Sequence, residues 1–184
     1  WGSETEPDEG VAGRRLVWPR GKVLGGSSAI NGLVYIRGQK QDYDHWRQLG
    51  NEGWGYDDIL PFFKKAEDQE RGSDDYHGSG GPLTVSDIRD RREICDAFME
   101  AAQQAGIPRN NDFNGIDQEG VGNFQTTSRN GLRCSAATGY LKSIKNRPNL
   151  RIETDAMVLN ILFDGKRASG IRFRQYGQEK IVHA

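Results

Sequence analysis

Glycine is the residue that most constrains this chain. It occupies 24 of the 184 positions, well above its usual share of about 7%. Because glycine lacks a Cβ atom, it accepts backbone conformations and close approaches that other residues exclude. Much of the backbone must therefore turn tightly or lie very close to a neighbour or a ligand.

The most informative glycines lie in residues 21–32, GKVLGGSSAING. Paired glycines allow the backbone to approach a ligand, and the hydroxyl and amide groups that follow can donate hydrogen bonds to an anion. The segment is not a Walker loop, because Val23 follows Lys22, and it is not a G-x-G-x-x-G turn after a strand. On this chemistry alone, a phosphate-binding loop and an ordinary tight turn fit about equally well.

The charge balance excludes several classes of partner. There are 25 Lys and Arg residues and 26 Asp and Glu residues, so the net charge is −1. Such a chain has no basic excess with which to bind nucleic acid or an anionic membrane surface. Apolar runs such as residues 156–159 are far too short to cross a bilayer. We therefore expect a soluble protein with no transmembrane segment and no nucleic-acid partner.

The cysteines and histidines give no metal or disulfide signature. Cys95 and Cys134 form no C-x-x-C pair, so neither a disulfide framework nor a zinc site is predicted. His45 and His77 have no ligand partners at metal spacing, and both are interpreted as structural or solvated residues. This cysteine usage fits a reducing, cytoplasmic compartment.

Hydrophobic spacing predicts helices in the first three quarters of the chain. Residues 1–20 have neither a helical nor a strand period and are predicted to be a loop. Helices are expected over residues 42–49 and over residues 58–68, the second with Asp58 as N-cap. A third helix is expected after Asp90, with Glu93 in a capping box and an apolar stripe made of Ile94, Ala97, Phe98, Ala101 and Ala105.

The rest of the pattern predicts strands and one further helix. Residues 83–85 and 121–127 are strand candidates, and Ser135 can cap a short helix that Pro148 ends. After residue 149 the period changes to two, which predicts strands over residues 150–152, 156–163 and 171–173. Turns at Asp164-Gly165 and Gly177 make this segment a β-meander.

The stretch from Gly21 to Asp44 resembles the first signature of the glucose-methanol-choline (GMC) family of FAD-dependent oxidoreductases. It has the family's Gly-Gly, Ser-Ser and Asn at the expected spacing, followed by Tyr35, Gly38 and Asp44. Supporting similarity extends over nearly the whole chain, for example in residues 112–115 and in Gly131 with Arg133. The resemblance is strongest to choline- and alcohol-oxidising members.

The resemblance implies an α+β fragment, with part of an FAD-binding domain and part of an antiparallel substrate domain. Residues 1–40 would be the FAD-binding segment and residues 41–82 a connection of helix and loop. Residues 83–148 would belong to the substrate domain, and residues 149–184 would return to the FAD-binding domain. The family's G-x-G-x-x-G turn would precede Trp1, and its second signature and catalytic His would follow Ala184, so we expect an internal piece of a longer enzyme.

The resemblance also assigns candidate cofactor-binding residues. Those that would line the flavin and its pyrophosphate, or form the approach to them, are Val23, Gly25, Gly26, Ser27, Asn31, Gly32, Leu33 and Val34. Val158 on the meander matches a position whose backbone holds the adenine end. Some family members carry a His bonded covalently to the flavin at the position of Ile30; isoleucine cannot form that bond, so a non-covalent FAD is expected.

The implied activity is oxidation of an alcohol, choline-like or another primary alcohol, to the aldehyde, with hydride transfer to flavin N5. None of the three His matches the family's catalytic base, so no catalytic residue is assigned and the isolated chain is expected to be inactive. The alternatives are an FAD-retaining lyase of the hydroxynitrile lyase type and a non-catalytic nucleotide-binding module. Uncovered strand edges would favour self-association of a fragment, and the longer enzyme is expected in the cytoplasm or at the periphery of the inner membrane.

Overall fold

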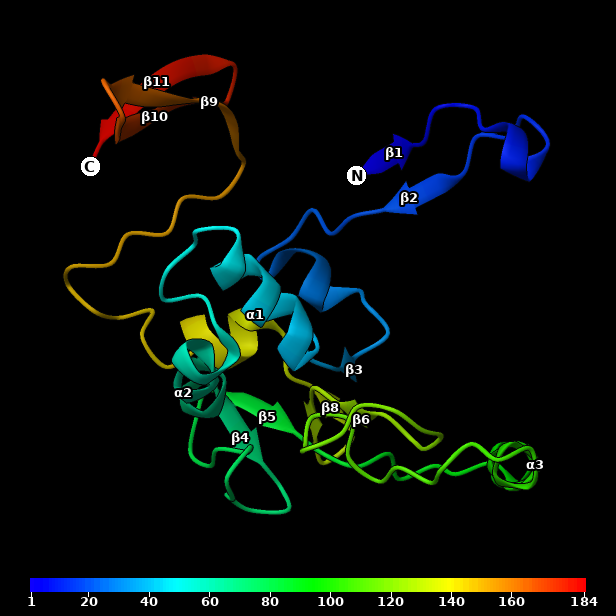
Figure 1. The fold of residues 1–184 in the computed structure, drawn as a ribbon. Helices are drawn as coiled ribbons and strands as arrows, with labels where there is room; N and C mark the ends of the chain where they lie inside the picture. The colour runs from blue at the N-terminus through cyan, green and yellow to red at the C-terminus, as the bar shows by residue number, and fades with distance from the viewer. The chain divides into compact units, whose positions relative to one another are not determined.

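The computed structural model describes residues 1–184 as two compact units, Trp1–Ser143 and Ile144–Ala184 (Figure 1). Short strands and three α-helices make up the first unit, and a three-stranded sheet makes up the second. This mixture confirms the predicted α+β class. The finer division into four segments stays a prediction.

The first twenty residues form a small hairpin. Strand β1 (Gly2–Glu4) pairs antiparallel with β2 (Val17–Pro19), and a 3-10 turn, η1 (Glu9–Val11), lies between them. The prediction of an irregular loop over residues 1–20 is therefore wrong. Every residue of both strands is exposed. Because neither face of the hairpin is buried, the sequence lacks the alternation of apolar and polar residues that usually marks a strand.

The short strands of the first unit pair segments that are distant in the sequence. Strand β3 (Val34–Tyr35) pairs with β6 (Gln125–Thr126), and β4 (Glu67–Gln69) pairs in parallel with β5 (Leu83–Val85). Strands β7 (Ser128–Arg129) and β8 (Leu132–Arg133) form a tight hairpin. The predicted strand at residues 83–85 is confirmed. Of the predicted strand 121–127, only Gln125–Thr126 forms a strand that pairs with another.

Two of the predicted helices are confirmed, with a correction to one cap. Helix α1 spans Lys40–Gln48 and α2 spans Tyr56–Ala66. The N-cap of α2 is Gly55 and not Asp58. Asp58 is the third residue of the helix, where its carboxylate accepts a hydrogen bond from the Gly55 amide (3.2 Å). Pro61 lies in the second turn of α2.

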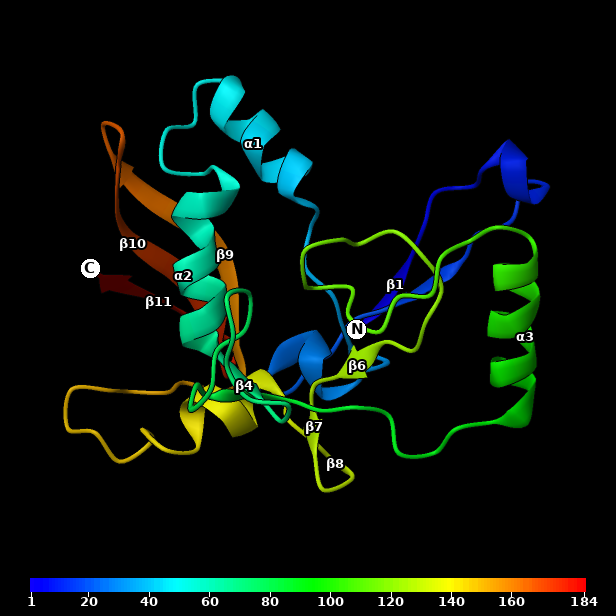
Figure 2. The same cartoon turned by 60° about the horizontal axis from the view of Figure 1, so that its bottom comes forward.

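Helix α3 (Glu93–Gln104) also forms where predicted, but it packs differently. Its N-cap is Arg92, so the predicted Asp90 cap is wrong. The expected apolar stripe is exposed, with Ile94 at 76% and Phe98 at 69%, whereas Met99 is 2% exposed. Figure 2 shows α3 joined to the rest of its unit by extended segments. Periodicity therefore predicted the helix correctly but not which of its faces this chain buries.

Ser135 lies at the start of the last helical turn of the first unit, but the N-cap residue is Ala136 and the turn ends at Leu141, well before the predicted end at Pro148. Its Oγ accepts a hydrogen bond from the Thr138 amide (3.2 Å), at the start of a five-residue π-type turn, η3 (Ala137–Leu141). A side-chain oxygen in this position satisfies a backbone donor that has no partner within the turn.

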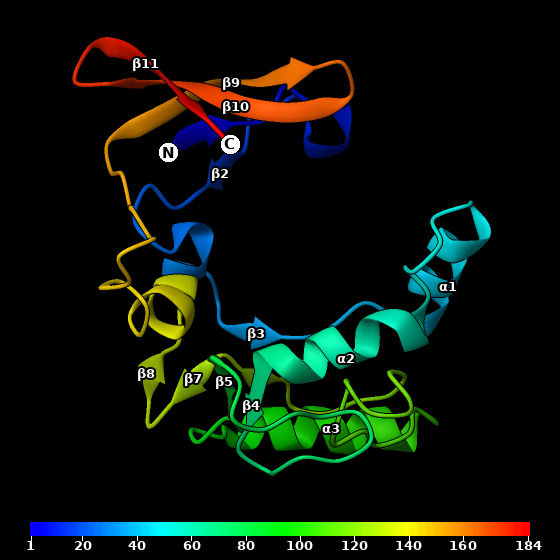
Figure 3. The ribbon, with the colours of Figure 1, turned by 90° about the vertical axis from the view of Figure 1, so that its left-hand side faces the viewer.

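The second unit is the predicted β-meander. Strands β9 (Ala156–Asp164), β10 (Arg167–Gln175) and β11 (Gln178–His183) form an antiparallel sheet in the order β11-β10-β9, and Figure 3 shows its twist. The separate strand expected at residues 150–152 is absent. Gly170 is required in β10, because a Cβ atom there would lie 2.4 Å from the Val182 carbonyl oxygen.

No helix of either unit is long and apolar enough to cross a lipid bilayer.

Candidate cofactor-binding site

The glycine-rich segment folds as a tight turn followed by one 3-10 turn. The Gly26 amide donates to the Val23 carbonyl oxygen (2.8 Å), and η2 spans Gly26–Ala29. Gly25 and Gly26 have φ values of +90° and +55°, which residues with a Cβ atom rarely adopt. A Cβ atom on Gly21 would lie 2.2 Å from the Gly26 carbonyl oxygen. The conformation of the loop thus explains these three glycines.

Gly32 needs a different explanation. Its φ lies outside the left-handed region, and a Cβ atom built on it would meet nothing within 4 Å. Neither strain nor internal packing therefore excludes a side chain at this position. Its absence leaves the backbone open to close approach by a ligand.

Several backbone donors of the loop have no partner inside the protein. No hydrogen bond is formed by the amides of Val23, Gly25, Ser27 and Gly32. Backbone amides without a protein partner are well suited to anionic oxygens. The two serine hydroxyls differ: Ser28 Oγ donates to the Gly25 carbonyl, whereas Ser27 Oγ accepts from the Gly21 amide (3.2 Å) and keeps its proton free to donate.

The charge of the surrounding sequence favours an anion. No Asp or Glu occurs from Gly10 to Gln41, and this stretch carries six cationic residues. Arg15, Arg37 and Lys40 pair with Glu6, Glu67 and Asp57, so the cations without a carboxylate partner are Arg14, Arg20 and Lys22. The loop also exposes apolar side chains beside its donors, with Val23, Ile30 and Val34 each more than half exposed. A mostly apolar surface with a few oriented polar groups is typical of cofactor sites.

Eight of the nine predicted residues lie in one continuous stretch of sequence, residues 23–34. At its end, Asn31 Oδ1 accepts a hydrogen bond from the Leu33 amide (3.2 Å), and Leu33 has a φ of +68°. The Leu33 carbonyl oxygen accepts from the Thr127 amide (2.9 Å). The ninth residue, Val158, belongs to the second unit, where it lies on β9 opposite Phe173 and is 51% exposed.

A buried ion network begins just after the loop, at Arg37. The Arg37 side chain is not solvated, and its charge is already paired with a buried carboxylate. Arg37 Nη2 donates to Glu67 Oε2 (2.9 Å), and the two side chains are 3% and 0% exposed. The Arg37 amide donates to Asn114 Oδ1 (2.8 Å). These contacts fix the chain immediately after β3.

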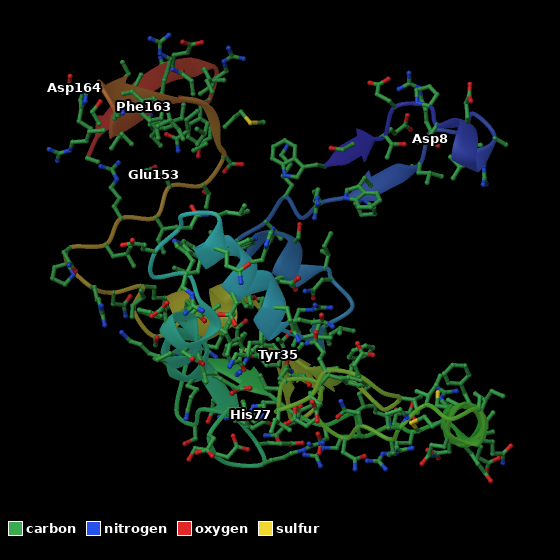
Figure 4. The ribbon with its side chains drawn as sticks, in the orientation of Figure 1. Asp8, Tyr35, His77, Glu153, Phe163 and Asp164 are labelled. Atoms are coloured by element: carbon green, nitrogen blue, oxygen red, sulfur yellow. The ribbon has the colours of Figure 1, made fainter.

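His77 completes this network (Figure 4). Its Nδ1 faces Glu67 Oε1 at 3.1 Å and its Nε2 faces Asp112 Oδ2 at 2.8 Å. Both ring nitrogens face carboxylates, and the imidazolium form is the one in which both can donate to them. Burial alone would lower the pKa of His77, but its hydrogen bonds to Asp112 and Glu67 outweigh burial and raise the pKa to about 9.

The network was not predicted. The interpretation of His77 as a structural residue is confirmed, but its partners Glu67 and Asp112 were not identified. Arg37, Glu67, His77 and Asp112 come from separate elements and loops, so no local spacing connects them. The only sequence feature that hints at the buried network is the low number of large apolar side chains in residues 67–82. Polar groups must therefore fill this part of the core.

The family model described as GMC oxidoreductase matches residues 9–184. The chain belongs to the GMC oxidoreductase family. Among curated members, the mitochondrial choline dehydrogenase of Mus musculus is 46% identical over 97% of this chain. The oxygen-dependent choline dehydrogenase of Burkholderia multivorans is 47% identical over 100% of this chain. The chain spans 30% and 33% of the lengths of these two GMC relatives.

Solved structures of GMC relatives have the same fold. Pyridoxine 4-oxidase from Mesorbium loti matches with a TM-score of 0.91 and 33% identity, over 100% of this chain and 36% of its own. An FAD-dependent oxidoreductase from Chaetomium thermophilum matches with a TM-score of 0.88 and 28% identity, over 100% of this chain and 34% of its own. The predicted GMC fold is thereby confirmed.

The residues of the loop fit the FAD that the GMC family implies. Unpaired amides and a free Ser27 hydroxyl proton suit a diphosphate, and the sequence has no Asp or Glu from Gly10 to Gln41. The exposed Val23 and Val34 side chains suit an apolar ring. The assignment of individual residues to parts of FAD stays a prediction.

The protonated His77 predicts a specific pH dependence of stability. A pKa raised from 6.5 to about 9 corresponds to about 3 kcal/mol of stabilisation. Because the folded-state pKa is the higher one, this contribution is complete below pH 6.5 and is lost as the pH rises through 9. Burial alone would raise the pKa of Asp112, but hydrogen bonds from His77 and the Asn114 amide lower it. Its contribution is therefore lost as the pH falls below about 4.

Urea unfolding of the wild type and of His77→Gln between pH 5 and pH 10 measures this effect. The difference in unfolding free energy between the two proteins should shrink steadily above pH 7. A difference that stays constant up to pH 10 would contradict a protonated His77.

Proposed function

We propose that this chain forms part of the cofactor bed of a longer FAD-dependent enzyme that oxidises an alcohol to the aldehyde, with choline or a similar small primary alcohol as the leading substrate. The observation that carries the proposal is the loop Val23–Val34, which combines open glycine backbone and unpaired amides within a stretch that lacks acidic residues. Family membership and the choline dehydrogenase relatives support it.

The chain's own residues have defined tasks in this proposal. The amides of Val23, Gly25, Ser27 and Gly32 donate to anionic or carbonyl oxygens of FAD, and Val34 contributes apolar surface. Val158 holds the adenine end through its backbone. The chemistry that FAD supplies when bound is two-electron oxidation, by acceptance of a hydride from the substrate carbon. Because an isoleucine occupies position 30, the cofactor is held by non-covalent contacts.

The test is anaerobic titration of the purified whole protein that carries this chain. The protein should show flavin absorbance in the visible region, release FAD on denaturation, and lose that absorbance when choline or another primary alcohol is added. A protein without flavin would contradict the cofactor assignment. A flavoprotein that no alcohol bleaches would contradict the oxidoreductase assignment and favour a lyase.

The substrate assignment needs a separate comparison. Choline should bleach the flavin faster than an uncharged primary alcohol of similar size, measured as an anaerobic rate at equal concentrations. Faster bleaching by the uncharged alcohol would exclude choline as the preferred substrate. The 184-residue chain alone should show no alcohol-dependent dye reduction.

A further inference from the structure

Arg133 binds the cofactor loop from a distant hairpin. Its Nη1 donates to the Ser28 carbonyl oxygen (3.0 Å) and to Asn31 Oδ1 (2.6 Å), and its Nη2 donates to the Asn31 carbonyl oxygen (2.8 Å). One planar guanidinium thus joins the end of η2 to the residue that turns the chain toward β3. These contacts bridge more than a hundred positions of sequence.

The hairpin that carries Arg133 is well defined. Asn130 and Gly131 have φ values of +51° and +74°, as in the two-residue turns that fit the natural twist of a hairpin. The turn sets the pairing of Ser128 with Arg133. The Cys134 amide donates to the Thr127 carbonyl (2.9 Å), and the Thr127 amide donates to the Leu33 carbonyl (2.9 Å). The hairpin and the loop therefore have a fixed relative position.

All three acceptors of Arg133 are neutral oxygens, and Arg133 takes part in no ion pair. Carbonyl oxygens at the end of η2 would repel an anionic ligand bound nearby, and hydrogen bonds from a cation reduce this repulsion. Lysine could supply the charge but not three bonds in a fixed planar arrangement. The geometry thus requires arginine.

We infer that Arg133 is a positioning residue, which holds the loop Val23–Val34 in the conformation that binds FAD. The inference rests on the proposed function, because it concerns the same cofactor. Arg133 acts through Ser28 and Asn31 and needs no contact with the cofactor. Loss of its hydrogen bonds should release the end of η2 and leave the loop amides poorly oriented.

The experiment compares Arg133→Met and Arg133→Lys with the matched control Arg129→Met in the whole protein. Arg129 lies on the same hairpin, but its partner is Asp68 and its side chain is 58% exposed. FAD dissociation constants from flavin fluorescence should rise about 10- to 100-fold for both Arg133 variants. The control should stay within about twofold of the wild type, because Arg129 bonds to Asp68 and not to the loop.

Amide hydrogen exchange of the cofactor-free proteins provides a second readout. Exchange in residues 25–33 should accelerate in both Arg133 variants and not in Arg129→Met, while β9–β11 exchange as in the wild type. A third variant, Arg133→Ala, allows chemical rescue. Millimolar guanidinium should restore part of its FAD affinity, because free guanidinium can bind where the Arg133 side chain was. A purely global loss of stability would not be reversed in this way.

The outcomes separate this inference from the proposed function. A wild-type protein that binds no FAD would contradict the proposed function. A wild type that binds FAD, with Arg133→Met binding equally well and loop exchange unchanged, would overturn only the inference about Arg133. Full affinity in Arg133→Lys would also overturn it, because charge alone would then be sufficient.

Discussion

Replacement of Glu67 by glutamine is expected to lower the free energy of unfolding by about 3–5 kcal/mol, although the side chain hardly changes in volume. The Glu67 carboxylate is fully buried and accepts hydrogen bonds from Arg37, His77 and the Gly78 amide. Its removal leaves the Arg37 cation buried without a counter-charge. Urea unfolding at pH 7 measures the loss.

The matched control is Asp90→Asn. Asp90 also pairs with an arginine, Arg92 at 3.2 Å, but both side chains are more than 70% exposed. Its substitution should cost less than about 1 kcal/mol. If Glu67→Gln were as mild as Asp90→Asn, the buried network would not stabilise the fold.

Replacement of Glu67 by glutamine should also lower the pKa of His77. Without the Glu67 carboxylate, only Asp112 is left to stabilise the buried imidazolium. The pKa of His77 should therefore fall from about 9 toward its ordinary value. Titration of the His77 imidazole by NMR measures this shift. An unchanged pKa in Glu67→Gln would mean that Asp112 alone stabilises the proton on His77.

The second large effect is expected at Gly32. Because a Cβ atom there meets nothing within 4 Å and the backbone is unstrained, Gly32→Leu should fold normally. If FAD lies against this backbone, the leucine side chain occupies its place. The dissociation constant for FAD should then rise by at least about 100-fold, or about 2.7 kcal/mol.

Gly2→Leu is the control for this prediction. Gly2 is the same residue type, is also unstrained, and a Cβ atom there likewise meets nothing within 4 Å. It lies on β1, outside the predicted site. Equal FAD affinities in Gly32→Leu, Gly2→Leu and the wild type would contradict a cofactor at the open side of Gly32.

Much of the regular structure could be predicted because its signals are local. Apolar residues at helical spacing marked α1 and α2, and alternation with the Asp164-Gly165 turn marked the meander. The β7–β8 hairpin was not predicted, although Asn130-Gly131 is a strong local hairpin signal. The β1–β2 hairpin could not be predicted, because short, fully exposed strands pair through backbone groups that every residue has.

The residues of the cofactor loop could be predicted from the sequence, but the contacts that support the loop could not. The loop carries a contiguous pattern, so its residues could be selected from the sequence. Arg133 was noted only as part of a family resemblance, and nothing near it in the sequence indicated that it would contact Ser28 and Asn31. Long-range hydrogen bonds of this kind depend on how β3, β6 and the β7–β8 hairpin come together, which no local pattern determines.

Amide hydrogen exchange of the whole protein with and without FAD tests the assignment of the cofactor bed most directly. FAD should slow exchange in residues 23–34, where the Val23, Gly25, Ser27 and Gly32 amides have no protein partner, and should leave α3 unaffected. Unchanged exchange in residues 23–34 at saturating FAD would contradict the assignment of this loop as the cofactor bed.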